Sequence, residues 1–295
     1  MKKIMLTILL ATVPTTLHAK LTVITTTTNL ASLVGEIGGD KVSVESLCRG
    51  TQDPHFLEAK PSYIFKLSKA DLLVDVGGGL EEGWLPLVVR GARNPDLITG
   101  GKGRLTGAES IKLIEQLKKA VTRSDGDVHP EGNPHFMLGP SVALEFSGEI
   151  LKRLIMLDKK NTEYYQANHK KFSSALTKQL AVWKKQFKPG AKVVSYHKTL
   201  SYFYKEFGVR NEMVLEPKPG IPPTASHIIS VMSHLKKEKI NKIIVENYFD
   251  PAVAMRIQKE QKDVNVLVVP VAVNGSAEVG SLLALYGHLV KNIGM

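Results

Sequence analysis

Cysteine and long hydrophobic runs are both scarce in this 295-residue chain. It contains a single cysteine, Cys48. That usage excludes an intramolecular disulfide and fits a protein of an oxidising compartment whose fold needs no such bond. The apolar run from Ile4 to Val13 is shorter than the roughly 20 residues of a membrane-spanning helix.

Several functional motifs are missing as well. The glycines at 77–79 follow an apolar stretch, but neither GxxxxGK[ST] nor GxGxxG accompanies them, which indicates a tight loop rather than a phosphate site. No HExxH and no nucleic-acid-binding motif is present. The formal net charge is +11, but the lysines are scattered, so we interpret the charge as a solvated surface and expect no nucleic-acid partner.

The first 19 residues have the three regions of a secretory signal peptide. A charged Met1-Lys2-Lys3 precedes the apolar run, and Leu17-His18-Ala19 ends it. Cleavage after Ala19 would remove residues 1–19. Because Lys20 rather than cysteine follows the cut, we expect a periplasmic protein without a lipid anchor.

Residues 158–187 are predicted to form one long amphipathic helix. Its apolar residues recur at spacings of three, four or seven, namely Tyr165, Phe172, Leu176, Leu180, Trp183 and Phe187. Lys188-Pro189-Gly190 ends it, since proline has no amide hydrogen and glycine tolerates the turn. At 1.5 Å per residue the helix would span roughly 45 Å, enough to link two lobes.

Strand-like and helix-like segments alternate on both sides of this helix. Before it, strands are expected at 21–25, 41–47 and 71–76, with helices at 29–37, from Pro61, at 109–121 and at 140–157. After it, strands are expected at 192–195, 243–245 and 264–271, with helices at 199–207, 224–239, 251–262 and 280–293. The alternation predicts an α/β fold with mainly parallel sheets flanked by helices. We therefore expect an N-terminal lobe (20–157), a rigid linking helix (158–187) and a C-terminal lobe (188–295).

Three histidines share one kind of setting. His55 in Asp-Pro-His, His135 in Asn-Pro-His and His197 in Ser-Tyr-His each fall in a loop. Carboxyl ends of strands are where α/β folds usually bind ligands, and neutral imidazole is a common ligand for transition metals. A metal bound by all three would lie between the lobes, although their spacing by itself is a weak indication.

The same residues carry a family resemblance. The motif DPHFLEAKPS at 53–62, followed by LSKADLLV at 67–74, resembles the first ligand motif of the ZnuA-like (cluster A-I) solute-binding proteins of zinc and manganese ABC transporters. NPHFMLGP at 133–140 resembles the second motif. Tyr196-His197 with Tyr202-Phe203 and Phe207-Gly208 resembles the third, and the order of the motifs matches over most of the chain.

This resemblance implies a binding protein rather than an enzyme. It implies two α/β lobes joined by a rigid helix, with His55, His135 and His197 as metal ligands. The protein would act as a monomer that captures a divalent cation and delivers it to an inner-membrane permease with its ATPase. Histidine at the third position favours Zn²⁺, with Mn²⁺ or Fe²⁺ as alternatives.

The fourth ligand departs from the family pattern. Many members have an aspartate after the last strand, whereas residues 269–275 here read VPVAVNG and contain no carboxylate. Water, Glu246 or Glu278 would complete the zinc sphere, and Glu246 is the preferred carboxylate as a ligand or a neighbour of the ligands.

The loop before the second motif is short. It carries Asp125, Asp127, His129 and Glu131 where zinc-binding members often have a long histidine-rich loop. A weak accessory metal site is conceivable in 125–131, but a simple surface loop is our expectation.

Two other function classes stay open at this stage. A zinc hydrolase would use three histidines and an open metal position, with Glu246 as the base. A metal-binding adhesin is suggested only by relatives described in that way, and the absence of a lipid anchor argues against it.

Overall fold

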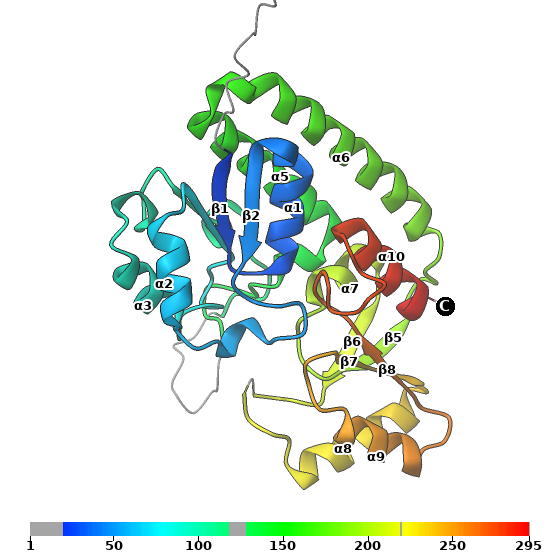
Figure 1. The fold of residues 1–295 in the computed structure, drawn as a ribbon. Coiled ribbons are helices and arrows are strands. Elements are labelled where there is room, and N and C mark those ends of the chain that lie inside the picture. The colour runs from blue at the N-terminus through cyan, green and yellow to red at the C-terminus, as the bar shows by residue number, and fades with distance from the viewer. Residues whose placement is uncertain (1–19, 118–127, 219, 295) are drawn as a thin grey trace, which may run out of the picture.

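Two lobes, each built on a four-stranded sheet, make up the structure, a computed structural model that describes residues 20–117, 128–218 and 220–294. The expected signal peptide lies outside these residues. Every strand pair in both sheets is parallel, and helices flank each sheet (Figure 1). The predicted α/β fold of two parallel-sheet lobes joined by a long helix is therefore confirmed.

The N-terminal sheet has the strand order β2-β1-β3-β4. Its strands are β1 (Leu21–Thr25), β2 (Val42–Ser46), β3 (Leu72–Asp75) and β4 (Arg104–Thr106). Its helices are α1 (Thr28–Gly38), α2 (Pro61–Ser68), α3 (Leu85–Ala92), α4 (Gly107–Ser110) and α5 (Pro140–Leu157). All four residues of β3 are buried, as expected for a parallel strand covered on both faces.

The predicted helix over 109–121 is wrong within the described residues, because α4 ends at Ser110. The backbone amides that a helix would use bond elsewhere. The Ile114 amide donates to the Tyr202 hydroxyl (3.1 Å), and the Leu117 amide donates to the Pro130 carbonyl (3.1 Å). These long-range bonds replace helical ones, so the amphipathic pattern does not decide the local structure. Strands β4 and β6 and helix α3 were not predicted either.

The C-terminal sheet has the order β6-β5-β7-β8. Its strands are β5 (Lys192–Ser195), β6 (Arg210–Val214), β7 (Lys242–Glu246) and β8 (Asn265–Val269). Its helices are α7 (Ser201–Phe207), α8 (Ala225–Lys237), α9 (Ala252–Glu260) and α10 (Leu282–Ile293). Thr224 caps α8 as predicted, since its hydroxyl accepts a bond from the His227 amide (3.3 Å).

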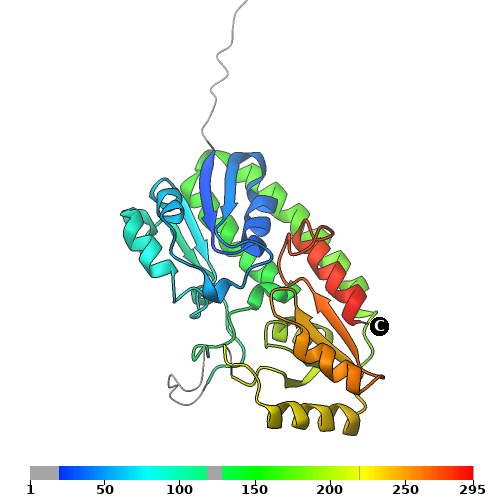
Figure 2. The same ribbon diagram turned by 60° about the horizontal axis from the view of Figure 1, so that its bottom comes forward.

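The linking helix is α6 (Thr162–Lys184), and it runs along both lobes (Figures 1 and 2). It packs on α1 and α5 of the first lobe and on α10 of the second. Four of the six apolar residues predicted for its inner face are buried: Tyr165, Phe172, Leu176 and Trp183. They belong to a hydrophobic core that continues from one lobe into the other. Among the described helices, none combines the length and apolar character needed to cross a bilayer.

The lobes also touch each other directly. The Asn29 side chain donates to the Val271 carbonyl (3.1 Å) and accepts from the Val273 amide (2.8 Å). Gly50 lies so close to this segment that a Cβ there would stand 2.3 Å from the Val273 carbonyl oxygen. The relative position of the lobes is therefore set by packing on α6 and by backbone contacts in the cleft.

Replacing Asn29 with alanine should destabilise the protein by about 2–4 kcal/mol, because two buried backbone groups lose their partners. Urea unfolding of metal-free protein would measure the loss. Asn265→Ala, at an exposed position of β8, is the matched control and should change stability by less than about 0.5 kcal/mol. Equal effects in the two variants would contradict the structural role of Asn29.

Candidate metal centre

His55 is held by the acidic residue two positions before it. It lies in a short 3-10 turn (Pro54–Phe56), where one Asp53 carboxylate oxygen accepts both the His55 amide (3.0 Å) and Nδ1 (2.6 Å). Burial by itself would raise the pKa of Asp53, but the hydrogen bond and charge of His55 outweigh burial and lower it. The ionised carboxylate therefore keeps the proton on Nδ1, so that Nε2 of His55 carries a lone pair.

His135 occupies a similar turn. The Asn133 side-chain oxygen accepts the His135 amide (2.9 Å), as Asp53 does for His55. The residue is only 8% exposed, and Nε2 finds no hydrogen-bond partner among the described residues. Burial, followed by the nearby His55, His197 and His129, lowers the pKa of His135 well below its usual value. A neutral imidazole with an unpaired buried nitrogen fits a metal ligand.

His197 comes from the second lobe, just after β5. Its Nδ1 donates to the Glu216 carboxylate (2.8 Å), and both side chains are buried. The Ser195 hydroxyl donates to the His197 carbonyl (2.7 Å), which fixes the backbone at the end of the strand. As with His55, a carboxylate bonded to Nδ1 orients the ring, so that Nε2 carries a lone pair.

These three predicted residues come together in the structure. The ring centroids of His55 and His135 lie 5.3 Å apart, those of His135 and His197 5.8 Å, and those of His55 and His197 6.0 Å. Three imidazoles on one tetrahedral zinc, with metal–nitrogen distances of about 2.0–2.1 Å, would have centroids about 5.2 Å apart. The observed separations exceed that value by less than an ångström.

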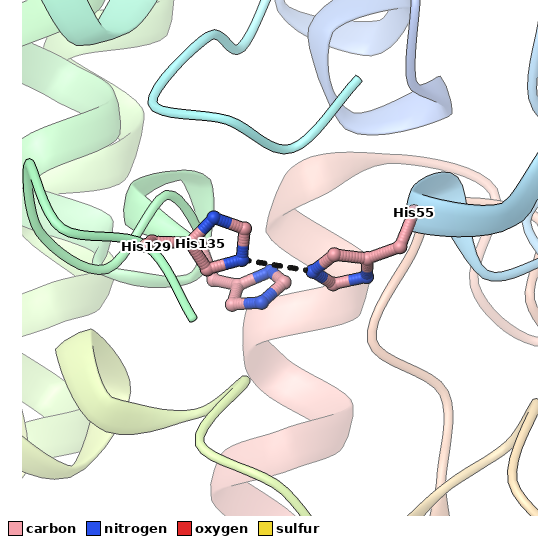
Figure 3. Close-up of side chains that lie close together, drawn as sticks. All are labelled: His55, His129 and His135. Atoms are coloured by element: carbon pink, nitrogen blue, oxygen red, sulfur yellow. Dashed lines mark hydrogen bonds between the residues drawn. The ribbon is translucent and has the colours of Figure 1, made fainter. Parts of the chain in front are cut away.

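A fourth imidazole, His129, lies beside them. Its Nε2 is 3.1 Å from Nε2 of His55, and Figure 3 shows the two rings meeting next to His135. One nitrogen from each of these three rings lies within 4.8 Å of the other two. The expectation of a simple surface loop is therefore wrong for His129. Asp125 and Asp127 lie outside the described residues.

Burial and the neighbouring His55 and His197 lower the pKa of His129 to about 4. Its ring is therefore neutral at neutral pH, as a metal ligand requires. Glu131, two residues further on, is exposed.

The two predicted carboxylates lie in different surroundings. Glu246 ends β7 and is completely buried, and burial raises its pKa to about 8, although Thr199 and the His197 backbone act in the opposite direction. Glu278 has a side chain that is 80% exposed and lies 3.5 Å from His288. Neither contributes an oxygen to the close group of ring nitrogens, so ligation by either stays a prediction.

The histidines line a path to solvent. A solvent-open cavity of about 110 Å³ is bordered by His129, His135 and His197. His135 also borders a second cavity of about 50 Å³ between the lobes, whose lining includes Cys48 and Tyr248. The first cavity therefore connects three of the histidines with solvent.

Sequence reasoning missed the residues that orient the three histidines. Asp53 and Asn133 could have been recognised, because aspartate or asparagine two positions before a residue commonly accepts its amide. Glu216 had no such indication, since it lies 19 positions from His197 and meets it only through the pairing of β5 with β6.

Comparison with known proteins supplies independent information. The family model described as ZnuA, zinc-uptake complex component A, periplasmic, matches residues 23–294. The manganese ABC transporter substrate-binding lipoprotein PsaA of Streptococcus pneumoniae is 27% identical over 248 residues, which cover 82% of this chain and 76% of PsaA. The iron ABC transporter substrate-binding lipoprotein MtsA of Streptococcus pyogenes serotype M1 is 29% identical, with 78% and 73% covered.

A crystal structure of ZnuA superposes with a TM-score of 0.76 at 22% identity, covering 94% of this chain and 100% of that one. At this level of identity the likeness shows a shared fold.

The buried Glu246 should make stability depend on pH in a recognisable way. Because its pKa is raised from 4.5 to about 8, the folded state retains a proton that the unfolded state releases. This stabilising contribution is complete below about pH 4.5 and is lost as the pH rises through about 8. Glu246→Gln does not titrate, so its free energy of unfolding relative to wild type should rise by about 2–4 kcal/mol between pH 5 and 8.

Urea unfolding of metal-free protein at several pH values would measure this difference. Glu278→Gln, at an exposed carboxylate, serves as the control. A difference between Glu246→Gln and wild type that does not change with pH would contradict the burial argument.

Proposed function

Because this chain belongs to the ZnuA family of periplasmic metal-uptake components, we propose that it is the solute-binding protein of an ABC importer for a divalent transition metal. It captures the cation between its lobes and delivers it to an inner-membrane permease and its ATPase. One observation carries this proposal. The ring centroids of His55, His135 and His197, which come from both lobes, lie within 6.0 Å of one another.

Zinc is the cation that we propose. Relatives are named for manganese and for iron, so their names alone do not choose the metal. The chemistry of the site supports zinc, because neutral imidazole nitrogens bind zinc well, whereas manganese prefers carboxylate, carbonyl and water oxygens. The low pKa of His135 keeps that ligand neutral at neutral pH, so protons compete weakly with the metal.

In this proposal His55, His135 and His197 bind the cation through ring nitrogens, while Asp53 and Glu216 orient two of the rings. Glu246 lies against the His197 backbone and Thr199, which favours a supporting position behind the ligand rather than a place in the metal sphere. Burial also raises its pKa to about 8, so the protonated form, which cannot accept a proton, is favoured at neutral pH. We propose binding and transfer of the metal, without a catalytic step.

The location follows from the same reasoning. We propose that residues 1–19 direct export and are removed, and that the monomeric mature chain, with lobes at 20–157 and 188–295 joined by 158–187, works in the periplasm. The curated relatives are named lipoproteins. The single cysteine of this chain, Cys48, is buried in the first lobe, which supports a form without a lipid anchor.

His135→Ala should abolish tight binding of zinc, lowering affinity at least about 100-fold, since it removes a buried ligand between the two lobes. Calorimetric titration of chelator-treated protein would measure affinity and stoichiometry, with about one tightly bound zinc per wild-type chain expected. His234→Ala, a histidine on α8 near Glu212, is the matched control and should bind like wild type. Unchanged zinc affinity in His135→Ala would defeat the proposed function.

Glu216→Ala should weaken zinc binding about 10- to 100-fold, because His197 loses the carboxylate that holds its ring and its Nδ1 proton. Competition with a chromophoric chelator would measure the change. Glu212→Ala, which removes a nearby glutamate paired with Arg210, is the control. If both variants bind zinc equally well, Glu216 has no orienting role.

A further inference from the structure

We propose that His129 is a fourth nitrogen ligand of the captured cation, so that four imidazoles surround the metal and favour zinc over manganese. This inference rests on the proposed function and adds a residue that determines its specificity. It is carried by the position of the His129 ring against His55 and by the absence of a competing carboxylate among the described residues.

Backbone hydrogen bonds attach the residues that follow His129 to the first lobe. The Asn133 amide donates to the Ile114 carbonyl (2.8 Å), and the Leu117 amide donates to the Pro130 carbonyl (3.1 Å). The Gly132 amide closes a turn on the His129 carbonyl (3.1 Å). His129 is thus held beside the cleft by backbone bonds, which reduces the entropy lost when its ring binds a cation.

The distance between the two facing nitrogens suits a shared metal. For metal–nitrogen bonds of about 2.0–2.1 Å, two nitrogens on one tetrahedral zinc lie about 3.3 Å apart. The Nε2 atoms of His129 and His55 are 3.1 Å apart, and their ring centroids are 5.2 Å apart. His135 supplies a third nitrogen within 4.8 Å of both. Little movement is needed for these three rings to bind one ion.

The hydrogen bonds around the pair leave both nitrogens facing the same point. Nδ1 of His55 is bonded to Asp53, so its Nε2 carries a lone pair. The Gly78 backbone accepts a hydrogen bond from the His129 ring. Nδ1 of His129 lies on that side, 3.1 Å from where a Cβ at Gly79 would stand. The loop of Gly78 and Gly79, which has no side chains, therefore leaves space for the His129 ring. It orients the ring from the Nδ1 side, as the hydrogen-bond partners of metal-binding histidines commonly do.

No described carboxylate takes the fourth position. Asp53 and Glu216 are already bonded to Nδ1 atoms of His55 and His197. Segment 269–275, where a carboxylate would stand by resemblance to the family, contains none, and its three valines, Val269, Val271 and Val273, are buried. Zinc prefers four ligands, and His129 is the group within reach.

Four neutral nitrogens also set the preference among metals. Manganese binds most weakly of the common divalent ions to a given nitrogen site, and it favours oxygen ligands. Exchanging a carboxylate for an imidazole at the fourth position therefore disfavours manganese more than zinc. The source of selectivity would be one side chain from a loop of the first lobe.

The test compares His129→Ala, His129→Asp and the control His234→Ala in the full mature chain after chelator treatment. Zinc and manganese affinities are measured by competition, and bound cobalt(II) is followed by its visible absorption, which is strong for four-coordinate sites and weak when water expands the sphere. For His129→Ala we expect zinc affinity to fall by at least about 10- to 100-fold, which is the loss typical of removing a residue that only supports a metal ligand. The cobalt absorption should weaken as well. His129→Asp should raise manganese affinity relative to zinc.

The outcomes separate this inference from the proposed function. If His135→Ala loses zinc while His129→Ala keeps wild-type zinc affinity and the wild-type cobalt spectrum, the role of His129 is overturned and the proposed function stands. If wild-type protein binds no divalent metal, the proposed function itself fails. If the ratio of zinc affinity to manganese affinity in His129→Asp equals that of wild type, the inference is also overturned. Circular dichroism of each variant verifies that it is folded.

Discussion

Two hydrogen bonds between carboxylate and imidazole decide what the cleft can do. Asp53 holds His55 and Glu216 holds His197, one pair in each lobe, and both bonds use Nδ1. A histidine whose Nδ1 is bonded in this way presents a lone pair on Nε2 with a fixed ring orientation. Without these bonds the rings could rotate or take the other tautomer, and their closeness alone would not make the Nε2 lone pairs converge.

Packing between the lobes determines how far apart those nitrogens stand. The core under α6 continues from one lobe into the other, and Asn29 is bonded to the backbone at Val271 and Val273. Interiors of this kind resist continuous deformation. The ring-centroid separations of 5.3–6.0 Å therefore differ by less than an ångström from the roughly 5.2 Å of imidazoles that share one tetrahedral zinc, so a large closure of two separate domains would not be needed for these rings to share an ion.

Burial has opposite effects on the acids and bases around the cleft. It lowers the pKa of His135 and of His129, and it raises the pKa of Glu246. In each case the neutral form is favoured, because a charge loses solvation in the interior. The imidazoles are thus ready to bind a cation at neutral pH. Glu246, in contrast, adds no negative charge behind His197.

The sequence by itself determined the α/β class and the linking helix, and it singled out the three histidines that the structure brings together, because periodicity and short motifs such as Asp-Pro-His are local properties. It failed for 109–121, where amides bond to Tyr202 and Pro130 instead of forming a helix. Only the tertiary structure decided that Glu216 meets His197 and that His129 faces His55. Those contacts join residues 19 and 74 positions apart, and strand pairing and loop packing, which bring them together, leave no periodic trace in the chain.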